Sequence, residues 1–96
     1  MQRGTVVIVL NGNGQKPFLG MVIEPVGNLS AKVKSGDTTD NYPTDKLIAL
    51  VQADSDELTM SSGAILARHL PEAFIALGAL IYRVAGDLEN HETFQH

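Results

Sequence analysis

A run of almost unbroken apolar residues near the C-terminal end most constrains how this chain can fold. Residues 71–86 read PEAFIALGALIYRVAG, and after the first turn only Gly78 and Arg83 interrupt the apolar side chains. Pro71 and Glu72 suit a first helical turn, where an amide hydrogen has no partner and a carboxylate meets the positive end of the helix dipole. A helix with no polar face must be covered on most sides, by its own domain or by a partner. The run is shorter than the roughly 20 apolar residues that a membrane span needs.

Composition narrows the class of protein. The chain has 96 residues, enough for one domain with a modest core, and it contains no cysteine. The lack of cysteine excludes disulfides, thiolate metal ligands and cysteine nucleophiles, and a disulfide-free domain of this size predicts a cytoplasmic protein. The net charge is −4, and most of the acidic side chains lie in the second half. Nucleic-acid binding through phosphate contacts needs clustered cations, so this charge disfavours it.

Five short strands are predicted in the first half of the chain. Glycine-rich and polar turns separate them at residues 11–16, 27–28 and 35–37, and residues 43–46 predict a single helical turn. The predicted strands are Gly4–Leu10, Phe18–Val26, Leu29–Lys34, Thr38–Tyr42 and Leu47–Val51.

These strands differ in how many of their faces are apolar. The third strand alternates, so we expect Leu29, Ala31 and Val33 to point inward and Lys32 and Lys34 to point outward. The first and last strands are apolar on both faces instead. A strand of that kind is covered on both sides, so each needs a second layer of structure.

The five strands, with Gly20 in the second, lysines in the third and the ending YPTDKLIALV, resemble the SH3-like small barrel. The resemblance covers residues 4–51. It implies a five-stranded barrel in which the first and fifth strands are neighbours and a one-turn helix precedes the fifth. KOW-type members of this group, found in transcription and ribosomal proteins, bind nucleic acid or protein. The strongly basic loops that such binders usually carry are missing from this chain.

The second half of the chain predicts helices. Asp54 followed by Glu57 fits a capping box at the start of a first helix, although Ser55 is an equal candidate for the cap. Ser61-Ser62-Gly63 is a weak point where this helix can split, with Ser62 capping the second start.

Proline and glycine set the remaining boundaries. Leu70 precedes Pro71 and therefore ends the first helix, because a residue before proline disfavours helical angles. The apolar helix follows at once and is expected to stop at Gly86. Residues 87–96 predict a flexible polar tail.

We therefore predict a single domain of the α+β class that is mainly β. A five-stranded SH3-like barrel over residues 4–51 is followed by a C-terminal helical hairpin over residues 54–86. The hairpin packs on the first and fifth strands, because these are the two that need cover on their outer faces.

The inventory of catalytic and metal-binding residues is thin. His69 lies near the end of the first helix, where a cation suits the dipole. His91 and His96 lie in the tail, which does not hold metal ligands in a fixed geometry. Three carboxylates gather around the threonine-rich turn without the spacing of a calcium loop: Asp37, Asp40 and Asp45. We expect no enzyme, no cofactor and no metal.

Three classes of function stay open. The first is a small non-enzymatic interaction or regulatory module that acts by protein–protein association. The second is a nucleic-acid-binding regulator that uses the KOW-like barrel face. The third is an enzyme with a shared site at an oligomer interface, which the versatility of the fold group allows.

An interaction groove is predicted around Tyr42, with the lysines Lys32, Lys34 and Lys46. The alternative is that Tyr42 is a half-buried plug of the barrel.

A homodimer is predicted through the apolar helix, because a barrel and one neighbouring helix cannot cover its whole circumference. The predicted self-association residues are Ala73, Ile75, Ala76, Gly78, Ala79, Leu80 and Tyr82. In the alternative, the first helix and the tail cover this surface and the protein is a monomer.

Overall fold

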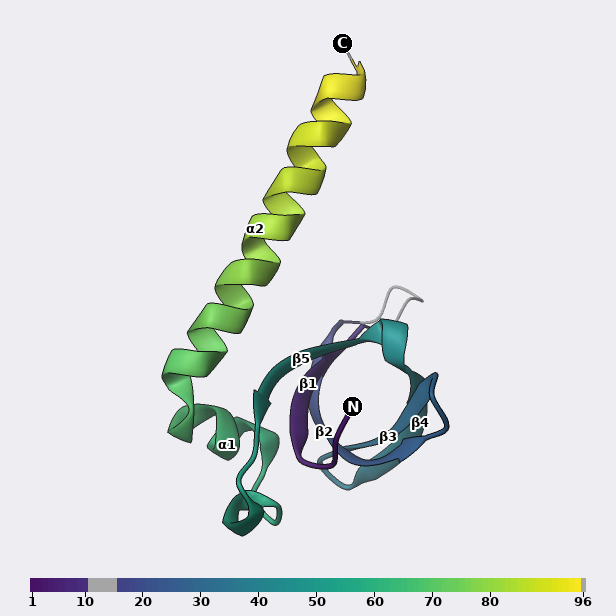
Figure 1. The fold of residues 1–96 in the computed structure, drawn as a ribbon, viewed down its shortest axis with the longest axis vertical. Coiled ribbons are helices and arrows are strands. Elements are labelled where there is room, and N and C mark those ends of the chain that lie inside the picture. Colours follow the sequence, from purple (N-terminus) through teal and green to yellow (C-terminus); the bar gives the residue numbers. More distant parts are fainter. Residues whose placement is uncertain (11–15, 96) are drawn as a thin grey trace.

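The computed structural model describes the backbone of residues 1–10 and 16–95 and the side chains of residues 1–10 and 16–82. Five antiparallel strands come first, and short helices and one long helix follow (Figure 1). The elements are β1 (Thr5–Val9), β2 (Phe18–Val26), β3 (Ser30–Ser35), β4 (Thr38–Pro43), the 3₁₀ turn η1 (Thr44–Lys46), β5 (Leu47–Gln52), the 3₁₀ turn η2 (Ser55–Glu57), α1 (Ser62–Arg68) and α2 (Leu70–Gln95). Every predicted strand is present within two residues of its predicted bounds.

The strands form one sheet in the order β4-β3-β2-β1-β5. This confirms the pairing of the first and fifth strands, and η1 stands before β5 as expected. Backbone hydrogen bonds of 2.8 Å from Thr44 to Leu29 and from Leu10 to Lys46 tie η1 to the neighbouring loop and strand end. Figure 1 shows the sheet curled almost into a ring. Among the described residues no ladder joins β4 to β5, so the sheet is curled but open, and the predicted closure of a barrel is not found.

Two apolar cores lie on the two faces of this sheet. The inner core fills the curl, and its buried residues are Val7, Val9, Val22, Ala31, Val33 and Leu47. The outer core lies under the helices, and its buried residues are Val6, Met21, Leu50, Val51, Ala53, Ile65 and Ala73. Strands β1 and β5 contribute to both cores, because they are apolar on both faces. The prediction that their outer faces need a helical cover is confirmed.

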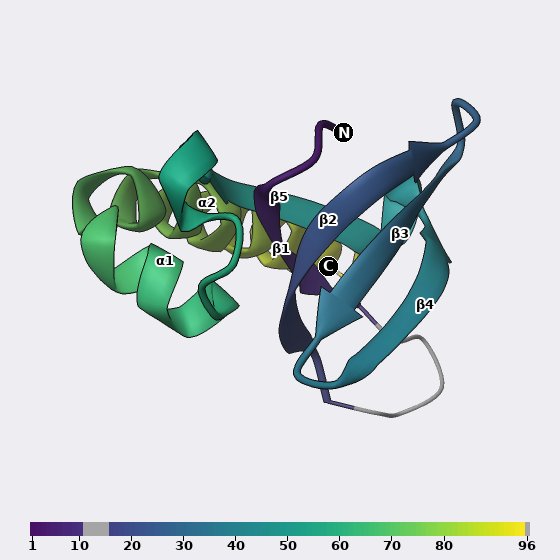
Figure 2. The same ribbon diagram turned by 90° about the horizontal axis from the view of Figure 1, so that it is seen from below.

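The helices lie on the β1–β5 side of the sheet (Figure 2). Helix α1 begins at the predicted weak point, but the predicted cap Ser62 is wrong because Ser62 is already the first helical residue. The Ser61 side chain caps the helix instead and accepts a hydrogen bond from the amide of Ala64 at 3.2 Å. Only His69 separates α1 from α2, and the chain bends there by 103°. An antiparallel hairpin needs a loop of about two to five residues, so the two helices form a corner and the predicted hairpin is wrong.

Helix α2 is longer than predicted. It continues through Gly86 to Gln95, so the expected stop at Gly86 is wrong. One glycine in a helix costs about 1 kcal/mol, and no proline follows it to block the next turn. Within the described residues no single helix is long and apolar enough to span a membrane, whereas α1 together with Leu70–Tyr82 meets that criterion as a bent pair.

Two further positions on the sheet refine the prediction. Leu29 is 78% exposed, so its predicted inward position is wrong, because β3 starts one residue later in the chain. Gly20 allows β2 to lie against β3, since a Cβ atom there would stand 2.5 Å from Cγ1 of Val33. Glycine is the residue that fits such a close approach.

Candidate functional site

One face of α2 leaves large apolar side chains in water. Phe74, Ile75, Ile81 and Tyr82 are 67%, 74%, 68% and 84% exposed, and Gly78 lies between the two pairs. We call these five residues the α2 strip. Their spacing of three, four and seven places them on one side of an α-helix. Figure 1 shows α2 beside β5 at its start and extending beyond the sheet further on.

The opposite face of α2 is the one that covers the sheet. Ala73 is 4% exposed within the outer core, and Ala76 and Leu77 pack against that core. Ala76, Ala79 and Leu80 line a groove of about 480 Å³ between α2 and the β5 end of the sheet. Of the predicted self-association residues, the structure therefore brings Ile75, Gly78 and Tyr82 together on the exposed strip. Ala73, Ala76 and Leu80 lie on the covered side instead, because this face of α2 packs toward β5. Ala79 is exposed at the edge of the covered face.

Sequence reasoning missed Phe74 and Ile81, which belong to the strip. The seven-residue spacing of Phe74 to Ile81 and of Ile75 to Tyr82 is visible in the sequence. It identifies a stripe, but in a helix with apolar residues all round it does not say which stripe meets the sheet.

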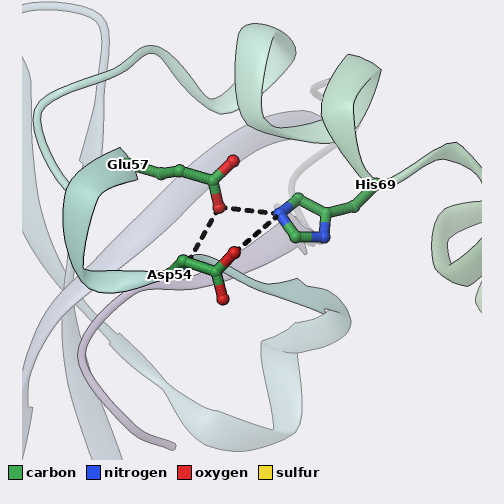
Figure 3. A group of neighbouring side chains, drawn as sticks. All are labelled: Asp54, Glu57 and His69. Atoms are coloured by element: carbon green, nitrogen blue, oxygen red, sulfur yellow. Dashed lines mark hydrogen bonds and ion pairs between the residues drawn. The ribbon is translucent and has the colours of Figure 1, made fainter.

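A second candidate lies at the corner between the helices, where Asp54, Glu57 and His69 meet (Figure 3). We call these three residues the corner cluster. Glu57 follows from the capping box of η2, and its Oε1 atom accepts a hydrogen bond of 2.8 Å from the backbone amide of Asp54. His69 Nε2 lies 2.7 Å from the same Oε1 atom and 3.9 Å from Oδ2 of Asp54.

The surroundings of the cluster are charged although Glu57 itself is only 1% exposed. Nε of Arg68 lies 3.3 Å from Oε2 of Glu57, and Oε2 of Glu72 lies 3.9 Å from Nδ1 of His69. The hydrogen bond from the Asp54 amide, and then that from His69, lower the pKa of Glu57. The hydrogen bond to Glu57 raises the pKa of His69. The cluster therefore fastens η2 to the α1–α2 corner as a charge-assisted pair.

The individual residues of this cluster were predictable from the sequence, but their contact in space was not. The capping pair and the position of His69 at the end of a helix were both predicted separately. Because η2 and α1 are two elements with a turn between them, the fold brings together residues that are 12 positions apart. The carboxylates Asp37, Asp40 and Asp45 are exposed, and the side chains of His91 and His96 lie outside the described residues.

The predicted groove is not assembled. Tyr42 lies opposite Ala31 in the β3–β4 ladder and packs on the inner core, with its ring 6.1 Å from that of Phe18. Tyr42 is thus the half-buried plug of the alternative interpretation. Lys32 and Lys34 alternate with inward-facing residues of β3 and so lie on the other face of the sheet.

The lysines are also separated from one another. Lys32 pairs with Glu24 at 3.1 Å, and Lys34 lines a groove between β2, the β3–β4 turn and the segment before α1. Lys46 is exposed in η1. No single basic surface therefore combines Tyr42 with these three side chains in the described part of the chain.

Comparison with known proteins finds no match: no family model, no curated protein and no solved structure matches this chain.

Proposed function

We propose that this chain is a small non-enzymatic interaction module that acts by self-association, with two copies meeting through the α2 strip. The observation that carries the proposal is the exposure of Phe74, Ile75, Ile81 and Tyr82 on one side of one helix. Exposed apolar patches of this kind on a small domain mark an interaction surface. A two-fold pair is the commonest arrangement that covers such a patch with itself.

The energy of burial is sufficient for a dimer. Complete burial of a large apolar side chain contributes about 1.5–3 kcal/mol, and two strips bring together four such side chains from each copy. The gross gain is therefore about 12–24 kcal/mol at most. Association costs about 4–15 kcal/mol in lost freedom of motion. A net value near −8 kcal/mol corresponds to a Kd of about 1 μM, which lies within this difference.

The strip also has the geometry of a self-complementary surface. Gly78 stands at its middle, and a Cβ atom there would have nothing within 4 Å, so a second backbone can approach closely at this point.

The relation to the SH3-like small barrel is part of the same proposal. It is supported by the strand order, by the pairing of β1 with β5 and by the one-turn helix η1 before β5. In this proposal the curled sheet is the scaffold that presents α2. Nucleic-acid binding has less support, because Tyr42 and the lysines of β3 lie on opposite faces of the sheet.

Light scattering of the full chain across micromolar concentrations tests the proposal. The expected mass is about twice the 10.3 kDa of one chain. Ile81→Glu places a charge within the α2 strip and should shift the protein to a monomer. The variant should still fold, because the Ile81 side chain is 68% exposed in the single chain.

Leu29→Glu is the matched control, since Leu29 is 78% exposed at the β2–β3 turn, away from α2. This variant should remain a dimer. A monomeric wild-type chain would overturn the proposal, whether it stays free or binds to phospholipid vesicles added in a parallel experiment. So would a dimer that Ile81→Glu leaves intact.

A further inference from the structure

Three potential ligand atoms of the corner cluster lie close together. Nε2 of His69, Oε1 of Glu57 and a carboxylate oxygen of Asp54 all lie within 4.8 Å of one another (Figure 3). Zinc binds histidine nitrogen and carboxylate oxygen at about 2.0–2.2 Å, which places neighbouring ligands about 3.3 Å apart in a tetrahedron. The observed separations from Nε2, 2.7 Å to Glu57 and 3.9 Å to Asp54, lie on either side of that value. Shifts of about 0.6 Å therefore bring both distances from Nε2 to the tetrahedral value.

The surrounding groups already hold these ligands in place. The backbone amide of Asp54 takes one lone pair of Oε1 of Glu57, and Arg68 contacts Oε2, so the lone pair that faces His69 is the one left for an ion. On the other side of the imidazole, the carboxylate of Glu72 lies 3.9 Å from Nδ1. In metal sites a carboxylate that accepts a hydrogen bond from the other ring nitrogen orients the histidine. Glu72 lies on that side of His69, although 3.9 Å is longer than a hydrogen bond.

The charge of the cluster suits a dication. Three carboxylates, those of Asp54, Glu57 and Glu72, lie within 3.9 Å of the His69 ring nitrogens. One guanidinium, that of Arg68, pairs with Glu57. With a neutral imidazole this leaves two negative charges around His69. The Asp54 side chain is 73% exposed and the His69 side chain 18% exposed, so the cluster opens to solvent on one side. An ion can enter from that side and keep a water ligand there.

We propose that the corner cluster is a binding site for a divalent transition-metal ion of the zinc type, held by Asp54, Glu57 and His69 with water in the fourth position. The ion replaces the proton that Glu57 and His69 share, and that proton is released to solvent. Glu57 of η2 and its N-cap residue Asp54 supply two ligands, and His69 between α1 and α2 supplies the third. The ion therefore fixes the orientation of α2 relative to the sheet. This site goes beyond the sequence-based expectation of no metal and does not depend on the proposed dimer.

The ligand set also predicts which ions are excluded. A histidine nitrogen with two carboxylates suits zinc and its neighbours, whereas magnesium and calcium prefer oxygen ligands throughout. Zn²⁺ is therefore the probe, and Mg²⁺ is the comparison ion that should not bind.

The experiment is calorimetric titration of the EDTA-treated, desalted full chain with ZnCl₂, together with ¹⁵N-detected NMR of the histidine rings. The expected result is one Zn²⁺ per chain and a shift of the Nε2 resonance of His69. Asp54→Asn keeps the shape and a hydrogen-bond acceptor but loses the charge, and should weaken binding about tenfold or more, as loss of even an outer partner does in metal sites generally. His69→Ala should abolish binding at this site.

Two control variants distinguish the corner cluster from zinc capture elsewhere on the chain. Asp56→Asn removes an exposed carboxylate of the same turn and should leave the affinity unchanged. His91→Ala with His96→Ala removes the tail histidines and should also leave it unchanged. The proposal is overturned if the wild-type chain takes up no Zn²⁺, if Asp54→Asn binds as tightly as wild type, or if the tail variant alone loses binding. Should His69→Ala not fold, the Asp54→Asn titration and the His69 resonance decide the matter.

Discussion

The substitution Leu50→Ala tests whether α1 and α2 form a well-packed core with the outer face of the sheet. Leu50 lies in β5 and is 7% exposed, in the same cluster as Ile65 of α1 and Ala73 of α2. If the helices cover this face as firmly as the inner core is covered, truncation of Leu50 must leave a cavity. If the helices contact this face only loosely, Leu50 is often hydrated in the folded protein, and its truncation lowers the free energy of unfolding only slightly.

The expected magnitude follows from core truncations. Replacing a buried leucine by alanine costs about 2–5 kcal/mol, according to how far the surroundings collapse. A domain of this size has a total free energy of unfolding of about 5–14 kcal/mol. Leu50→Ala should therefore remove a large fraction of the stability of the protein. With a urea m-value of about 1–3 kcal/mol per molar, the midpoint should fall by at least about 0.7 M.

Urea unfolding followed by circular dichroism measures this at one fixed protein concentration. Leu29→Ala is the control, since it makes the same change at a side chain that is 78% exposed. It should alter the free energy of unfolding by no more than about 0.5 kcal/mol. Equal effects of the two variants would refute the conclusion that α1 and α2 close a core over β1 and β5.

Urea unfolding also tests the pH dependence of the corner cluster and the packing around two glycines. In EDTA, the free energy of unfolding should fall as the pH rises above 6.5, because the pKa of His69 is raised above this ordinary value in the folded chain. The variant His69→Gln should show no such dependence on pH. Below 4.5 the stability should fall as well, because Glu57, whose pKa is lowered, loses its charge; a flat profile on both sides contradicts the role of the pair. Gly20→Ala should cost about 1–3 kcal/mol, because the added Cβ stands 2.5 Å from Val33, and a neutral result contradicts the close approach of β2 and β3. Gly63→Ala, whose Cβ meets nothing within 4 Å in α1, should instead stabilise the protein by about 0.5–1 kcal/mol.

The sheet was predictable because its signals are local. Alternation in β3 and apolar residues on both faces of β1 and β5 give strand positions and the need for a second layer. Turn residues then place the boundaries, as at Gly36, whose φ of 59° suits glycine. Leu29 was misplaced because the alternating pattern begins one residue before the strand itself does.

The helices were less predictable because their boundaries depend on tertiary packing. The split before α1 was visible at Ser61 to Gly63, but the sequence does not contain the angle between α1 and α2. The single residue His69 leaves no room for a reversal, and contact with β5 then decides which side of α2 is covered. For the same reason Ala73 and Ala76 were expected on the self-association surface but lie against the sheet.

The corner cluster was beyond sequence reasoning for a different reason. Glu57 looks like an ordinary capping residue, and nothing in its local sequence indicates that it is buried. Burial follows from the turn between η2 and α1, which brings His69 and Arg68 back over its carboxylate. The pairing is a product of three elements, and only the assembled fold shows it.

Disulfide formation by Gly78→Cys tests directly whether two copies meet through the α2 strip. The chain has no cysteine of its own, so the variant reports on one position. Two helices that cross at this residue bring the sulfurs of two copies within bonding reach, since a disulfide needs Cα atoms about 4.4–6.8 Å apart. Mild oxidation at micromolar concentration should convert Gly78→Cys to a covalent dimer, while Leu29→Cys, which is also exposed but remote from α2, should form no disulfide between copies. If Gly78→Cys forms a disulfide no faster than Leu29→Cys, two copies do not meet through the α2 strip.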